Sequence, residues 1–383
     1  MAFAGASDVR GFDVGTNVVR DASGTQTSAY EGDLSPDELI AMTGFPSGLT
    51  LAQAESYATA SITDLRLDKV MGYLARAELP SMDERDLLSL GRWEVTDYRT
   101  ELNDKEILTA DRAYFNGDSF EWVIPSDFNL GVSGATLNTG ELTGFFKILF
   151  ETFMNEAMLD EMDEDERTQV EQVREGVDKA IELLPEHGLD TLPFDFDLSM
   201  SWDADQGPSD FGLVFDADGY GRTAMALALD LPTYDAAKAA YEAEDQDAAF
   251  ETAFEDGFAF RGASYSEEDK GAYDKLFGFA HAIGKEYPNE GWGAVLGSME
   301  PAQLRSYLGT IMRMAKPGAE QDFPPAAEWI ESFATYLETG GRIEFASQPP
   351  VPITRALIDQ FDDQDPEPDE IVELFGLTVT HTK

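Results

Sequence analysis

A regular alternation of apolar and polar residues marks the clearest strand of this chain. Aspartates and serines occupy every second position between residues 194 and 202. The apolar positions are Phe194, Phe196, Leu198, Met200 and Trp202. Because successive side chains of a β-strand point to opposite faces, the alternation predicts a strand with one apolar face and one polar face.

Similar patterns, separated by turn residues, predict further strands. The predicted strands span residues 61–67, 93–100, 106–109, 120–124, 194–202, 211–215, 223–229, 258–263, 342–346 and 375–380. Turn signals such as Asn103-Asp104 and Gly219-Tyr220-Gly221 separate several of them. Short strands joined by tight turns are typical of antiparallel meanders.

Apolar residues spaced by three and four positions predict helices after each group of strands. The expected helices span residues 35–40, 142–159, 164–184, 234–250, 267–285, 301–314, 324–337 and 353–361. The Phe-rich stretch 142–159, which Lys147, Glu151 and Glu156 interrupt, is interpreted as a buried helix rather than a helix lying on a membrane. The reason is that an anionic membrane would repel so acidic a chain.

These patterns predict an α+β protein with two related antiparallel β-meanders, each followed by helices. The expected halves are residues 1–187 and 188–383, a degenerate repeat that could join into one curved, extended sheet. The alternating strands are expected to bury one face under the helices.

The charge of the chain excludes several classes of partner. Its 383 residues include 75 Asp or Glu and 26 Lys or Arg, which gives a net charge of −49. Nucleic acids and anionic membranes would be repelled. Lys is scarce, and an acidic surface with little Lys favours a halophilic setting in which salt screens self-repulsion. Weak, nonspecific binding of cations is expected.

The chemistry-bearing residues favour no cofactor and no metal site. Cys is absent, and His187, His281 and His381 lie far apart in the sequence. Aspartates cluster at residues 203–205, 216–218 and 362–365, but none of these clusters has the spacing of the twelve-residue calcium-binding loop. Whether calcium binds in another arrangement is left open.

Enzymatic motifs are equally sparse, and no catalytic residue is predicted. The stretch Gly131-Val132-Ser133-Gly134, expected in a loop, is one residue short of a serine-hydrolase elbow. Gly219-Tyr220-Gly221 superficially fits a dinucleotide-binding turn, but the period-two pattern after it favours a hairpin. Because one residue in five is Asp or Glu, pairs of carboxylates at any spacing arise by chance, and spacing alone assigns none of them to catalysis.

Three stretches resemble the AsmA-like and YdgA-type β-rich proteins of the alphaproteobacterial cell envelope. The first comprises residues 90–99, 107–111 and 120–125, the second residues 194–229, and the third residues 340–345, 349–352 and 374–380. The resemblance implies an export signal and a curved sheet whose apolar concave face is suited to shielding lipid or another apolar ligand. Residues 1–8 contain no export signal, so the expected location is periplasmic or envelope-associated if a signal is missing, and otherwise cytoplasmic.

The leading hypothesis is a non-enzymatic envelope protein that binds or scaffolds, with a lipid or other apolar ligand on a sheet face. The candidate ligand-binding residues are Phe194, Phe196, Leu198, Met200 and Trp202. An ordinary core is the alternative interpretation of these five residues. A hydrolase with an acidic catalytic pair and a self-associating virion or surface-layer component are the alternative functions.

Overall fold

A single antiparallel sheet organises the chain. The computed structural model describes residues 12–13, 18–19, 22–30, 51–153, 164–288, 291–362 and 366–383. Within these residues the fold is α+β, as predicted, with one 14-stranded sheet whose neighbouring strands mostly follow one another in sequence. The predicted helical turn at 35–40 and the end of the predicted helix 142–159 lie outside the described residues.

The sheet runs from β1 to β14 in nearly sequential order. Its strands are β1 (Phe12–Asp13), β2 (Val18–Val19), β3 (Ala22–Tyr30), β4 (Leu51–Thr63), β5 (Gly91–Leu102), β6 (Lys105–Glu121), β7 (Ile124–Leu137), β8 (Leu192–Trp202), β9 (Pro208–Ala217), β10 (Gly221–Asp230), β11 (Ala259–Asp269), β12 (Gly341–Ser347), β13 (Ile353–Thr354) and β14 (Leu377–Thr382). Strand β3 pairs with β4, and β13 pairs with β11, outside the main path.

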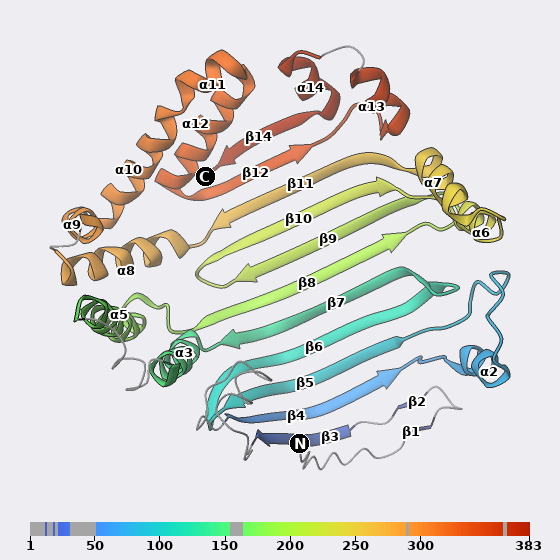
Figure 1. Cartoon of the computed structure of the whole chain (residues 1–383), viewed down its shortest axis with the longest axis horizontal. Coiled ribbons are helices and arrows are strands. Elements are labelled where there is room, and N and C mark those ends of the chain that lie inside the picture. Colours follow the sequence, from blue (N-terminus) through green and yellow to red (C-terminus); the bar gives the residue numbers. More distant parts are fainter. Residues whose placement is uncertain are drawn as a thin grey trace.

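Helices gather around the margins of the sheet. They are α2 (Asp68–Arg76), α3 (Thr139–Phe153), α5 (Glu164–Leu183), α6 (Tyr234–Tyr241), α7 (Gln246–Gly257), α8 (Ala272–Glu286), α9 (Gly291–Ser298), α10 (Pro301–Met314), α11 (Lys316–Asp322), α12 (Pro324–Thr339), α13 (Arg355–Asp362) and α14 (Pro368–Phe375). Figure 1 shows α3, α5, α8 and α9 near one end of the strands and α2, α6 and α7 near the other. Among the described helices, none crosses the middle of β5–β10 in this view.

Local sequence signals explain several element boundaries. Helix α10 has the predicted bounds because Pro301 occupies its first turn and Glu300 forms a capping box with Gln303. Helix α12 begins at Pro324 and ends before Gly340, whose φ of 68° suits glycine. The predicted strand 194–202 lies within β8.

Other predicted elements required correction. Residues 120–124 form a hairpin rather than a strand, because β6 ends at Glu121, Trp122 has a φ of 58° and β7 begins at Ile124. The stretch 131–134, predicted as a loop, belongs to β7, where an irregularity in the pairing with β8, between residues 132 and 135, accommodates Gly134.

The helical predictions also differ in detail from the structure. Residues 267–269 complete β11, and α8 starts only at residue 272, after Gly271 with its φ of 124°. The predicted helix 234–250 is divided into α6 and α7, and the N-cap of α7 is Asp245. The short helix α14 follows a second capping box, between Glu367 and Glu370, in a stretch where no helix was predicted.

The sheet continues across the predicted boundary between residues 187 and 188. Strands β7 and β8 pair antiparallel from Asp127 opposite Ser201 to Leu137 opposite Leu192. The two halves therefore share one ladder of backbone hydrogen bonds, and the division into two related halves stays a prediction.

Candidate apolar binding site

One face of the sheet carries a row of apolar side chains in register. Leu198 on β8 lies opposite Leu130 on β7 and Leu213 on β9. From Leu213 the row continues through Met225, Tyr265, Phe345 and Val379, and from Leu130 through Phe115, Trp93 and Ile62. Directly opposed residues of antiparallel strands point to the same face. The row therefore crosses the sheet from β4 to β14.

The opposite face is polar. Asp197 accepts hydrogen bonds from the Tyr114 hydroxyl at 2.6 Å and from the Asn129 amide at 2.9 Å. On the same face, Arg112 donates to Glu94 at 2.7 Å. These strands thus separate an apolar side from a side on which polar groups satisfy one another.

A groove lies on the apolar face between β8 and β14. Its volume is about 540 Å³, within the range of roughly 300–1,000 Å³ that is typical of small-molecule sites. The floor includes Leu198, Leu213, Met225, Tyr265, Phe345 and Val379, and Trp329 of α12 contributes to the wall. Among the described residues that line it, none carries a charge.

The middle of this groove is open to solvent. The side chain of Met225 is 49% exposed, and that of its neighbour Leu227 is also exposed. The prediction that the helices would bury the apolar face is thus wrong for this part of the sheet, because the described helices lie at the strand ends and over β12 and β14. An exposed apolar patch on a folded chain commonly marks a binding surface.

The five predicted ligand-binding residues share the apolar face but not one environment. Leu198 lines the groove, whereas Phe194 contacts the ring of Phe215 at a centroid distance of 5.3 Å. Phe196 and Met200 lie on the same face, outside the described groove lining. Trp202 is only 8% exposed and belongs to a core cluster with Met82, Ala204 and Tyr234.

Several groove residues were missed by sequence reasoning. The alternation in 211–215 and 223–229 contained a signal for Leu213 and Met225, since both occupy apolar positions of predicted strands. Trp329 lies on a correctly predicted helix, but the sequence of that helix does not indicate that the helix reaches the groove. The groove therefore became visible only through cross-strand register and helix placement.

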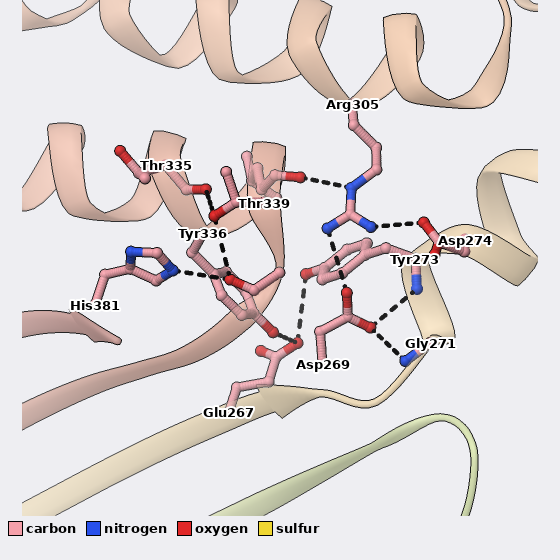
Figure 2. A network of polar contacts seen from close by, with 12 residues as sticks. Glu267, Asp269, Gly271, Tyr273, Asp274, Arg305, Thr335, Tyr336, Thr339 and His381 are labelled. Atoms are coloured by element: carbon pink, nitrogen blue, oxygen red, sulfur yellow. Dashed lines mark hydrogen bonds and ion pairs between the residues drawn. The ribbon is translucent and has the colours of Figure 1, made fainter. Parts of the chain in front are cut away.

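Tyrosine hydroxyls gather around Glu267 beside the groove, and Figure 2 shows those of Tyr273 and Tyr336. The hydroxyls of Tyr336 and Tyr273 donate to Glu267 Oε1 at 3.0 and 3.3 Å. The hydroxyl of Tyr265, a groove residue, donates to Oε2 at 3.1 Å. Tyr336 belongs to α12, as does Trp329, so these bonds hold the groove wall against the sheet.

Arg305 joins a second part of the same network (Figure 2). Its guanidinium contacts Asp269 at 3.2 Å and Asp274 at 2.8 Å, and donates to the Leu337 carbonyl at 2.9 Å. The Arg305 and Asp269 side chains are 9% and 5% exposed. One side chain of α10 is thereby bonded to β11, α8 and α12.

Burial governs the protonation of the tyrosines in this network. Burial is the main cause that raises the pKa of Tyr273 to about 12, with a smaller contribution from nearby Glu267. It also raises the pKa of Tyr336 and Tyr265. These phenols remain neutral near pH 7 and can all donate to Glu267.

Described carboxylates with shifted pKa values do not suit general-acid catalysis. Lys238 lowers the pKa of Asp83, Lys69 lowers that of Asp86, and Arg313 lowers that of Glu338. A general acid working near neutral pH requires the opposite shift. These three groups are therefore ionised partners of cations.

The histidines serve in local contacts. His281 is buried on α8, with Nδ1 at 3.1 Å from the Leu296 carbonyl oxygen. His381 Nε2 lies 2.8 Å from the Gly340 carbonyl oxygen. Within the described ranges, no group of three or more His, Cys, Asp or Glu could hold a metal ion.

Comparisons with known proteins give no family for this chain. No family model matches it, and no curated protein matches its sequence. The resemblance to AsmA-like and YdgA-type proteins therefore stays a prediction. Among the helices that the structure describes, none is long and apolar enough to span a membrane.

Proposed function

We propose that this protein is a non-enzymatic binder of an uncharged, elongated apolar molecule, with the alkyl chain of a neutral lipid as the ligand class. The observation that carries the proposal is the open groove of about 540 Å³ on the apolar face of the sheet. Solvent-exposed Met225 and Leu227 would be covered by such a ligand. Burial of apolar surface stabilises by about 25 cal/mol per Å².

The chemistry of the groove favours a neutral ligand over a fatty acid. No Lys, Arg or His is among its described lining residues, so a carboxylate would lack a cationic partner. The net charge of −49 adds long-range repulsion of anions. An envelope location is part of the proposal, because alkyl chains are membrane components.

The proposal can be tested with two ligands of equal chain length, a long-chain alcohol and the corresponding fatty acid. Native mass spectrometry and isothermal titration would follow each ligand against the wild-type protein. We expect the alcohol to bind at 1:1 stoichiometry and the acid to bind at least tenfold more weakly, since its charge would be buried without a partner.

Met225→Asp provides the decisive variant. Its carboxylate would lie in the middle of the groove, where we expect it to reduce affinity for the alcohol at least tenfold. Ala224→Asp is the matched control, because it adds the same charge one residue away on the opposite face. No alcohol binding by the wild type, or equal losses in both variants, would overturn the proposal.

A further inference from the structure

The region around α10 lacks the acidic coat of the rest of the chain. Residues 301–319 contain no Asp or Glu, although 75 of the 383 residues are acidic. Residues 291–299, which include α9, contain no charged residue at all. Glu300 is the one acidic residue between residues 291 and 319.

The two arginines of α10 are turned toward the protein. Arg305 is buried in the network around Asp269. Arg313 donates to Glu331 at 2.9 Å and to Glu338 at 3.0 Å, both on α12. The face of α10 that solvent contacts is therefore left without charge.

Large apolar side chains are exposed on α10 and on the helix before it, α9. On α10, Tyr307, Ile311 and Met314 follow helical spacing, and Met314 is 77% exposed. On the preceding helix α9, Trp292 and Val295 are exposed as well. We call the residues Trp292, Val295, Tyr307, Leu308, Ile311 and Met314 the uncharged band. None of the six is among the lining residues of the groove.

We propose that the uncharged band docks on the surface of a zwitterionic lipid bilayer. Trp and Tyr favour the boundary between headgroups and acyl chains, where aliphatic side chains can insert. Absence of carboxylates from the outer faces of α9 and α10 avoids dehydrating charge at this boundary. An anionic bilayer would repel the remainder of the chain, so a zwitterionic surface is the occupant that the charges favour.

The size of the band argues against a stable protein partner. Helix α10 has 14 residues, so its outer face measures about 21 Å by 10 Å, or roughly 200 Å². The shorter helix α9 adds less than this area. Stable protein interfaces bury about 800 Å² on each partner. Insertion into a bilayer needs only a few side chains, because each large apolar side chain that leaves water contributes favourable free energy of its own.

Flotation with lipid vesicles tests the proposal on the full chain. The probes are vesicles of pure phosphatidylcholine, and the same vesicles with phosphatidylglycerol added, at low and at molar salt. We expect the wild type to float with phosphatidylcholine vesicles, and to float less with the anionic vesicles at low salt.

Two substitutions locate the contact. Ile311→Asp and Met314→Asp should each lower the bound fraction at least fivefold, since they place a charge in the band. Leu74→Asp is the matched control: it replaces an exposed apolar residue of another helix, α2, with the same charge. Circular dichroism would verify that each variant is folded, and Met314, with its high exposure, tolerates substitution best.

The outcomes separate this proposal from the groove. Met225→Asp should leave vesicle binding unchanged, because Met225 lies outside the band. Vesicle binding lost in Met225→Asp but kept in Met314→Asp would assign the bilayer contact to the sheet face and overturn the proposal. No flotation of the wild type, or equal flotation of the wild type and both band variants, would overturn it too.

Discussion

At the scale of single residues, Glu267 shows how a carboxylate can be held by neutral donors. Three tyrosine hydroxyls surround it, from Tyr265, Tyr273 and Tyr336. Hydrogen bonds to charged groups contribute more to stability than those between neutral groups. The arrangement depends on the tyrosines keeping their protons, which burial favours.

Alkaline pH should therefore destabilise the protein through Tyr273. Its pKa is about 12 in the folded protein, against an ordinary value of 10.0. Between these values the unfolded chain loses the phenol proton first, so the free energy of unfolding falls as pH rises from about 10 through 12. The contribution is fully present below pH 10. Urea unfolding across pH 8–12 would measure it.

Tyr273→Phe removes this titrating group, so the free energy of unfolding should fall less steeply between pH 10 and pH 12 than it does in the wild type. Tyr307→Phe is the control, because Tyr307 is an exposed tyrosine outside the network. If the free energy of unfolding depended on pH in the same way in the wild type and in Tyr273→Phe, the role assigned to Tyr273 would be contradicted.

At the scale of elements, the network of Arg305 connects three helices to one strand. Helix α10 reaches Asp269 at the end of β11, Asp274 on α8 and the Leu337 carbonyl on α12 through this one side chain. The position of α12, and with it the wall of the groove, therefore depends on a buried ion pair as well as on apolar contacts.

Arg305→Met should destabilise the protein strongly. Removal of one partner from a buried ion pair typically costs about 3–5 kcal/mol, because the remaining carboxylate is left buried without its cation. Arg342→Met is the matched control: Arg342 pairs with Glu344 at 2.8 Å on an exposed part of β12, and exposed pairs contribute roughly 0–1 kcal/mol. Chemical denaturation of both variants would show whether Arg305→Met lowers the free energy of unfolding more than Arg342→Met does.

How much of this architecture could be predicted from the sequence depends on the range of the signal. The alternation in 194–202 and the residues that begin α10 lie close together in the sequence. Because these signals are local, β8 and α10 were both predicted. The hairpin at Trp122 was hidden, since an apolar turn residue continues the strand pattern. Register between β11, β12 and β14 joins segments far apart in the chain, so the groove they form left no local pattern.

At the scale of the whole molecule, charge and shape act together. A single-layer sheet has a large surface for its volume, and only a limited set of residues is fully buried. A net charge of −49 spread over that surface creates self-repulsion, which favours expansion of the chain.

Salt should therefore stabilise the fold by screening. The screening length falls from about 10 Å at 0.1 M to about 3 Å at 1 M ionic strength. We expect the thermal unfolding midpoint to rise by several degrees over this range, in chloride salts of sodium and potassium alike. A midpoint that stays constant, or that rises only with divalent cations, would contradict general screening and favour a specific ion site.

The sequential strand order also bears on how the sheet assembles. From β4 to β11 each strand has its chain neighbour as its sheet neighbour, so most ladders close over loops or short helical segments. The junction of β11 with β12 differs, because α8–α12 lie between these strands in the sequence. Loop-closure entropy rises with the length of chain enclosed, and long-range pairings slow folding. The pairing of β12 with β11, which helps to complete the groove, thus encloses a longer stretch of chain than any ladder between β4 and β11 and carries a greater entropic cost.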